Sequence, residues 1–140
     1  MKISISIVLL LTTSLLIYAC GDQNPDGNPG EPASVDELGE RVEAHNQNEE
    51  FEEALDLLRD SDEEDPEVQS MLETVHMNYA LYLTYEVGQD NMRKNMPKAL
   101  EHYRRVLELN PDHERAQQEI DQIEEIYQQL GRDIPEGVAE

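Results

Sequence analysis

The chain has 140 residues, of which 32 are acidic and 10 are basic, so its formal net charge at pH 7 is -22. This charge repels phosphate backbones and anionic lipid headgroups, and it excludes nucleic-acid binding through a basic face. A single Cys excludes an internal disulfide, and the sequence has no Cys and His cluster of the kind that binds structural zinc. We therefore expect one small domain that depends on its apolar core, together with accessory segments.

The first twenty residues have the layout of an export signal. Lys2 supplies a positive charge, an apolar run follows over residues 3–18, and small Ala19 precedes Cys20. The segment Ile17-Tyr18-Ala19-Cys20 resembles the lipobox of bacterial lipoproteins, with Tyr18 where that family more often has a small residue. The resemblance implies removal of residues 1–19 as a signal peptide, and a diacylglycerol with acyl chains such as palmitate on Cys20, with no other cofactor. An uncleaved transmembrane helix is the alternative, because the run is nearly long enough.

The lipid that this resemblance implies would hold the protein at a membrane despite its negative charge, because each buried methylene contributes about 0.8 kcal/mol. We therefore expect a lipid-anchored periplasmic or surface protein of the bacterial cell envelope. Gly21 follows the Cys, where an Asp favours retention in the inner membrane of some bacteria. The outer membrane is accordingly the preferred location.

The segment after the signal is predicted to be a lipidated Cys and flexible tether, residues 20–34. Gly, Pro, Asp and Asn dominate it, and such a composition cannot bury enough apolar surface to fold. Asp22, Asn24 and Asp26 also match the opening of a calcium-binding loop, but Ala33 replaces the closing Glu and Pro29 lies within the loop. A calcium- or small-molecule-binding lipoprotein is therefore the last-ranked interpretation, and no metal ligands are predicted.

The following residues predict a pair of helices. Ser34 and Glu37 form a capping box at the start of the first helix, which ends near residues 47 and 48. The second helix starts near Glu49 and ends in the acidic run of residues 60–65.

Three longer helices follow. Asp65 caps the third helix, which extends to about Val87 and is apolar on nearly every side from Met77, so it should lie at the centre. A fourth helix starts near residues 95–97. The last helix ends at Gly131, and residues 132–140 are predicted to be a frayed tail.

Two segments share one pattern. Phe51-Glu-Glu-Ala54-x3-Leu58 and Met96-Pro-Lys-Ala99-x3-Tyr103 each have a Pro twelve residues after the Ala. The pattern resembles the tetratricopeptide repeat family, most clearly over residues 99–111. Over residues 35–131 the resemblance implies an all-α, right-handed solenoid of antiparallel helix hairpins with about five helices. The two Ala residues are 45 positions apart, against 34 in that family, and we assign the excess to a longer third helix and the loop of residues 88–95.

The resemblance implies a groove for a protein partner, lined by the first helix of each pair. The candidate groove residues are Glu43, Asn46, Gln47, Glu73, Met77, Arg115, Gln118 and Gln122. A clamp for carboxyl termini, known in some members, would need Lys and Asn where Gly39 and Glu43 stand, so that ligand is not predicted. Solenoids usually need about three repeats, and here the long third helix or a homodimer would supply the missing core.

Half of the basic residues lie close together in the sequence. They form a candidate basic patch of Arg93, Lys94, Lys98, Arg104 and Arg105, which could dock an acidic partner. The favoured alternative is that these side chains pair with nearby Glu residues on the same helix, such as Glu101 and Glu108. The overall acidity itself is explained either by a high-salt habitat or by a functional acidic surface.

No arrangement in the sequence favours catalysis. The four His residues are scattered, and neither a nucleophile motif nor a phosphate-binding glycine loop is present. The leading prediction is therefore a membrane-anchored adaptor that binds a protein partner and is not an enzyme. The alternative is a structural subunit of an envelope or outer-membrane assembly complex, held through an apolar edge of Leu81, Tyr85 and Val87.

Overall fold

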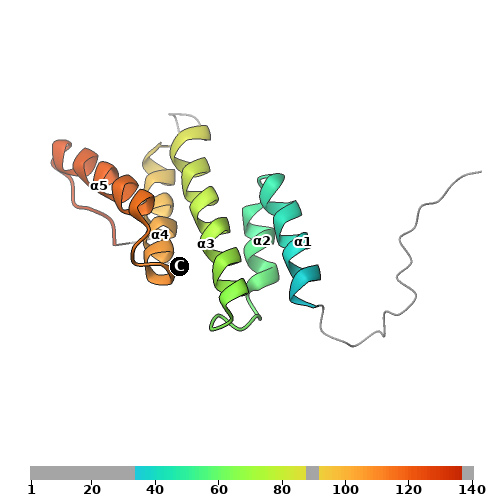
Figure 1. Ribbon diagram of the computed structural model, residues 1–140. Coiled ribbons are helices and arrows are strands. Elements are labelled where there is room, and N and C mark those ends of the chain that lie inside the picture. The colour runs from blue at the N-terminus through green and yellow to red at the C-terminus, as the bar shows by residue number, and fades with distance from the viewer. Residues whose placement is uncertain (1–33, 88–91, 137–140) are drawn as a thin grey trace, which may run out of the picture. The chain divides into compact units, whose positions relative to one another are not determined.

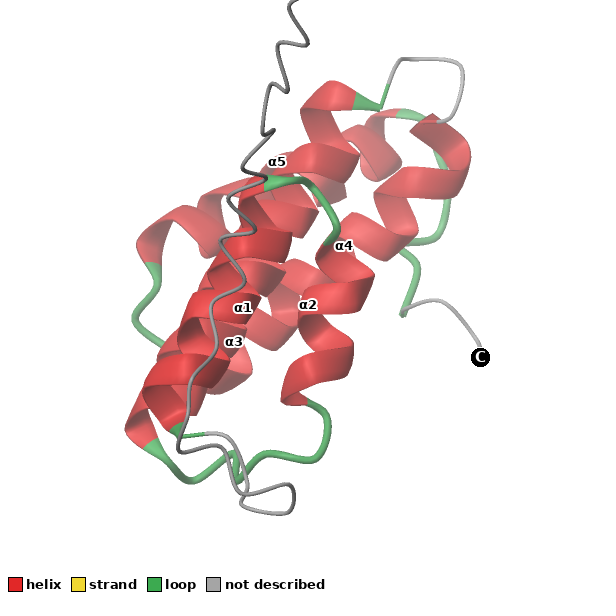
Figure 2. Cartoon of the chain, turned by 90° about the vertical axis from the view of Figure 1, so that its right-hand side faces the viewer, coloured by secondary structure: helices red, strands yellow, loops and turns green. Residues whose placement is uncertain are grey.

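The protein was examined as a computed structural model that describes residues 34–87 and 92–136, without the side chains of residues 92 and 93. Within these residues, five α-helices and one π-helical turn follow one another in chain order (Figure 1). They are α1 (Val35–Gln47), α2 (Phe51–Leu58), α3 (Pro66–Leu81), the π-helical turn η1 (Tyr82–Glu86), α4 (Met92–Leu109) and α5 (Glu114–Gln129). The described part contains only helices and loops (Figure 2), which confirms the all-α prediction. The predicted signal peptide, Cys20 and the segment that resembles a calcium-binding loop lie outside the described residues.

The helix ends follow the predicted capping chemistry. The Ser34 hydroxyl accepts a hydrogen bond from the backbone N–H of Glu37 at 3.3 Å, and the Asp65 carboxylate accepts one from the N–H of Glu67 at 2.8 Å. Each bond satisfies an N–H that has no partner within its helix. Gly131 has a φ of +61° just after α5, as a C-terminal stop requires.

The core consists of two apolar clusters that share α3. The first joins α1, α2 and α3 through Val42, Phe51, Ala54, Leu58, Val68, Leu72, Val75 and Tyr79. The second joins α3, α4 and α5 through Met77, Ala80, Ala99, Leu100, Tyr103, Val106, Ala116, Ile120 and Ile123. Because α3 packs against α1, α2 and α4, the predicted central position of the third helix is confirmed.

The third and fourth helices differ from their predicted bounds. η1 replaces the last turn that the sequence predicts as α-helix to Val87. α4 begins at Met92 and holds Pro97 in its interior. Proline lacks an N–H, so the carbonyl four residues earlier in α4 has no helical partner. With its start at Met92, α4 already includes residues 92–95, which the sequence predicts as the end of a loop.

The segment after α5 is the other difference. The sequence predicts a frayed tail from residue 132, but Ile134 packs against the cluster shared by α3, α4 and α5. The guanidinium of Arg104 on α4 donates to the backbone oxygens of Pro135 and Glu136, at 2.8 and 3.0 Å. The packing of Ile134 on this cluster and the two hydrogen bonds from Arg104 thus hold residues 134–136 against the helices.

Candidate protein-binding groove

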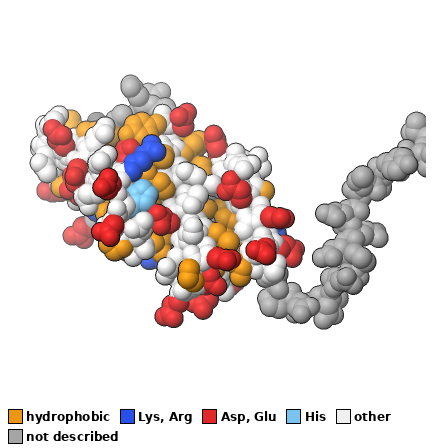
Figure 3. Space-filling model, in the orientation of Figure 1, with side chains coloured by type: hydrophobic (Ala, Val, Ile, Leu, Met, Phe, Trp, Pro, Cys, Tyr) orange, Lys and Arg blue, Asp and Glu red, His pale blue; other side chains and the backbone are white. Residues whose placement is uncertain are grey.

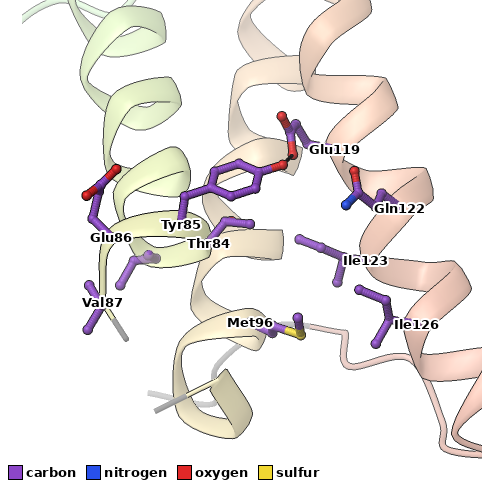
Figure 4. A pocket seen from close by; sticks show the side chains of 10 residues that line it. Thr84, Tyr85, Glu86, Val87, Met96, Glu119, Gln122, Ile123 and Ile126 are labelled. Atoms are coloured by element: carbon purple, nitrogen blue, oxygen red, sulfur yellow. Dashed lines mark hydrogen bonds between the residues drawn. The ribbon is translucent and has the colours of Figure 1, made fainter. Parts of the chain in front are cut away.

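An apolar hollow lies between η1, α4 and α5. Its volume is about 350 Å³. It is lined by Leu83, Thr84, Tyr85, Glu86, Val87, Met96, Glu119, Gln122, Ile123 and Ile126, which we call the η1–α5 groove (Figure 4). In Figure 4 the side chains of Met96, Ile123 and Ile126 lie together on one side of the hollow and supply an apolar floor. A cavity of this size accommodates a few apolar side chains of a bound molecule.

The π-helical turn gives the groove its first wall. The hydroxyl of Thr84 donates to the backbone oxygen of Ala80 at 2.8 Å and lies 3.3 Å from the hydroxyl of buried Tyr103. The N–H of Val87 closes the turn on the oxygen of Tyr82 at 3.2 Å. π-helical turns widen a helix by one residue and are common at functional sites. Here the turn leaves Tyr85 54% exposed at the rim of an apolar cavity.

One hydrogen bond crosses the groove. The hydroxyl of Tyr85 donates to the Glu119 carboxylate at 2.5 Å, so the ring bridges from η1 to α5 (Figure 4). This hydrogen bond, together with partial burial, raises the pKa of the Tyr85 hydroxyl. The Glu119 side chain is only 12% exposed, and Arg115 approaches it from one turn away with Nε at 3.9 Å. The bridge therefore shields a carboxylate at the edge of the apolar floor.

The residues predicted to line one groove are separated in the structure. Met77 is 7% exposed and belongs to the core, because α3 is packed on more than one side. Asn46 is also buried, and its side-chain oxygen accepts from Asn78 at 3.3 Å. Glu73 accepts from the amide of Asn110 at 3.1 Å. All three side chains thus make contacts within the fold. The prediction that Met77 and Asn46 face a partner is wrong, because both are buried.

The remaining candidates lie on the surface. Gln47 donates to Glu43 at 2.8 Å along the exposed side of α1. Gln118 is exposed on α5, and Arg115 lines a separate hollow that also includes Tyr85 and Glu86. Of the eight predicted groove residues, only Gln122 lines the η1–α5 groove. The groove wall on η1 matches instead the apolar edge of Leu81, Tyr85 and Val87, two of which line it.

The described members of the candidate basic patch are largely paired. Lys98 donates to Glu52 at 2.5 Å, Arg104 reaches Glu124 at 3.4 Å, and Arg105 donates to Glu108 at 2.8 Å and to Glu63 at 2.5 Å. Lys94 is exposed, and the side chain of Arg93 lies outside the described residues. Acidic partners thus come from α2, the α2–α3 loop, α4 and α5, so the arrangement favours internal pairing over a cationic docking surface.

A buried polar cluster between α3 and α4 was missed by the sequence analysis. The Nδ1 atoms of His76 and His102 are 2.9 Å apart, and the His102 ring lies 4.5 Å from the ring of Tyr79. Burial lowers the pKa of His76 to about 4. Burial and the adjacent His76 lower the pKa of His102 to about 3. Each of these imidazoles is therefore neutral near pH 7, and the pair is a part of the packed interior.

The Tyr79 hydroxyl continues this cluster toward the surface. It donates to Glu52 at 2.8 Å and accepts from Lys98 at 2.6 Å. Burial disfavours the Lys98 ammonium, but its hydrogen bonds to Glu52 and Tyr79 outweigh that effect and raise the pKa of Lys98. The 26-residue separation of the two histidines explains the failure of sequence reasoning, since only the packing of α3 on α4 brings them together.

Acidic side chains are spread over the face of the described part seen in Figure 3, with apolar atoms between them. In residues 34–87 and 92–136, no three His, Cys, Asp or Glu side chains are grouped so that they could hold a metal ion. Among the helices of these residues, none combines the length and apolar character needed to cross a membrane. Comparison with protein-family models, with curated proteins and with solved structures finds no match to this chain.

Proposed function

We propose that this protein is a lipid-anchored adaptor of the bacterial cell envelope, whose helical domain binds a protein partner in the η1–α5 groove. The observation that carries the proposal is the groove itself, in which an apolar floor of Met96, Ile123 and Ile126 meets an exposed tyrosine. Exposed aromatic side chains beside apolar pockets are typical anchors of protein interfaces. The adaptor interpretation requires no cofactor besides the lipid.

The packing of the helices supports a tetratricopeptide-like organisation in this proposal. α1 packs against α2, α3 packs against α4, and α3 also contacts α1 and α2, as successive antiparallel hairpins do. Ala54 and Ala99, the small residues of the repeated pattern, have no exposed surface. α4 then packs against α5, so the closing helix covers the second hairpin and supplies one wall of the groove.

The anchor in this proposal rests on the sequence. Ile17-Tyr18-Ala19-Cys20 places the single Cys of the chain at the end of an apolar run, directly before a segment rich in Gly and Pro. A lipid on Cys20 and a tether up to residue 34 would keep the helical domain near a membrane surface while leaving its groove free to meet a partner. The outer membrane is the preferred location.

Site-specific photocrosslinking in membranes tests the function. A photoreactive amino acid replaces Gln122 in the groove or, as a control, exposed Glu53 on α2, in the full chain and in its Cys20→Ser variant. We expect a specific envelope protein to crosslink from position 122 but not from position 53, and the crosslink to weaken in Cys20→Ser. Equal crosslinking from both positions, or none from either, would contradict the adaptor function.

A structural subunit of an envelope complex is the second candidate, and the exposure of Tyr85 favours it. Tyr85 is one of only two large apolar side chains that are exposed within the described residues. A permanent assembly would cover it throughout the life of the protein. Crosslinks from position 122 that persist at constant yield through purification in detergent would favour this candidate over a reversible adaptor.

A further inference from the structure

We infer that the η1–α5 groove recognises a polypeptide segment that combines apolar side chains with a flanking lysine or arginine. This inference rests on the proposed adaptor function and specifies the chemistry of its partner. Three features of the groove support the inference. They are its apolar floor, the carboxylates at its edges, and the Tyr85 hydroxyl that crosses the groove to Glu119.

The floor defines the apolar part of the partner. Met96 and Ile123 are almost fully buried, and the half-buried Val87 and Ile126 flank them, so the cavity presents aliphatic and thioether groups to any occupant. Such a surface binds side chains such as Leu, Ile or Met, because burial removes apolar area of both molecules from water. The cavity volume of about 350 Å³ suits a few side chains and not a folded domain.

The carboxylates define the charged part. Glu86 is exposed at the rim, and within the described residues it forms no ion pair. Glu119 lies on the opposite wall, where Arg115 at 3.9 Å balances it only in part. In a chain with a net charge of -22, these carboxylates attract a cationic segment and repel an anionic one.

The same charges disfavour a second copy of this chain as the occupant. A symmetric dimer through the groove would bring Glu86 and Glu119 of one copy near the same residues of the other. Lys98, Arg104 and Arg105 are already engaged with carboxylates within the domain, and Arg115 already faces Glu119 at 3.9 Å. A partner that brings its own lysine or arginine avoids this repulsion.

Tyr85 supplies a group that a partner can displace. Its hydroxyl is the neutral donor to Glu119, and its ring is 54% exposed, so it can rotate away without opening the core. Hydrogen bonds between a carboxylate and a charged donor are stronger than those with a neutral donor. An arginine or lysine of the partner can therefore take the place of the hydroxyl at Glu119, while the released ring covers the bound segment.

Fluorescence anisotropy with three peptides tests the inference, using the full chain in phosphatidylcholine nanodiscs and empty nanodiscs as the blank. The first probe is an amphipathic helix with leucines on one face and lysines at both ends. The second has glutamates in place of the lysines, and the third keeps the lysines but has serines in place of the leucines. We expect only the first probe to bind, with an affinity that falls as salt rises from about 0.05 to 0.5 M.

Two matched pairs of variants locate the site. Ile126→Glu places a charge on the groove floor, whereas Leu130→Glu changes an apolar residue that is 61% exposed outside the groove. Glu86→Lys reverses a charge at the rim, and Glu53→Lys makes the same change of net charge on α2. We expect Ile126→Glu and Glu86→Lys each to weaken binding by about tenfold or more, and both controls to bind as wild type. Glu86→Lys changes an exposed side chain, so it stays informative even if Ile126→Glu fails to fold.

The outcomes separate this inference from the adaptor function. Equal binding of the first and third probes, or equal losses in Glu86→Lys and Glu53→Lys, would mean unspecific attraction and would overturn the inference. A dimer in sedimentation that Ile126→Glu dissociates, with no probe bound, would assign the groove to a second copy and would also overturn it. If position 122 captures a partner while all three probes fail, the adaptor function stands and only the partner chemistry is refuted.

Discussion

Replacing both His76 and His102 with glutamine should remove most of the acid sensitivity that the buried imidazole pair gives to the fold. In the folded protein burial lowers the pKa of His76 to about 4 and that of His102 to about 3. In the unfolded chain each imidazole titrates with a pKa near 6.5. As the pH falls below 6.5, the unfolded chain therefore binds protons that the folded protein does not, and the stability present above that pH is lost.

The size of the effect follows from these pKa values. Between pH 7.5 and pH 5 both folded imidazoles stay almost entirely neutral, while each unfolded one becomes almost fully charged. One proton per histidine over this window corresponds to a loss of about 2 kcal/mol, and the pair loses about 4 kcal/mol. Further acidification would also break the contact at 2.9 Å between the two Nδ1 atoms, because two protonated rings can both only donate.

Urea denaturation followed by circular dichroism at pH 7.5 and pH 5, at equal ionic strength, measures this difference. The change in unfolding free energy between the two pH values is measured for each protein, which cancels the cost of the substitutions. These changes are then compared between proteins, which cancels the titration of the many carboxylates that the proteins share. His45→Gln is the control, because His45 lies on the surface beside Glu50 at 2.7 Å and the variant keeps both buried imidazoles. If the double variant loses as much stability between the two pH values as wild type, the burial argument is refuted.

Three further pairs of variants test the packing, the caps and the turns by urea denaturation. Leu58→Ala should lose about 2–5 kcal/mol because Leu58 is 1% exposed, whereas Leu130→Ala, at a residue 61% exposed, should change stability by less than about 0.5 kcal/mol. Asp65→Ala should cost about 1 kcal/mol through loss of its hydrogen bond to the N–H of Glu67, and Asp65→Asn should retain most of it. Glu49 and Gly131 both have positive φ angles, 62° and 61°. Glu49→Gly should therefore stabilise the fold by up to about 1 kcal/mol, and Gly131→Ala should destabilise it by a similar amount. If both changes stabilise the fold, or both destabilise it, this reasoning is contradicted.

The sequence predicts the helices where local rules act alone. Ser34, Asp65 and Gly131 mark helix ends through hydrogen bonds and a backbone conformation that involve only nearby residues. The central position of α3 was also predictable, because apolar residues on nearly every side of a helix require neighbours on more than one side. These features depend on spacing within one segment, and spacing is what a single sequence contains.

The sequence fails where two distant segments decide the outcome. The resemblance to a repeat family predicts Met77 in a surface groove, yet the packing of α4 and α5 buries it. The sequence predicts that Arg105 pairs within its own helix, and it does contact Glu108, but it also reaches Glu63 in the loop before α3. The His76–His102 contact has the same origin, since it joins α3 to α4. No local pattern indicates such pairs.

In the π-helical turn η1, a local sequence rule and the contacts with distant segments favour different structures. The sequence from Tyr82 to Glu86 continues the apolar pattern of α3, so local rules predict α-helix there. Thr84 is only a weak indication of an irregular turn, through its ability to donate a hydrogen bond from its hydroxyl to the carbonyl one turn earlier. The structure departs from the local rule at the residues that form one wall of the η1–α5 groove. A departure from the local preference is expected where a surface must present side chains to something other than its own core. The exposed ring of Tyr85 and the carboxylate that it covers are therefore the first groups at which the proposed partner should be sought.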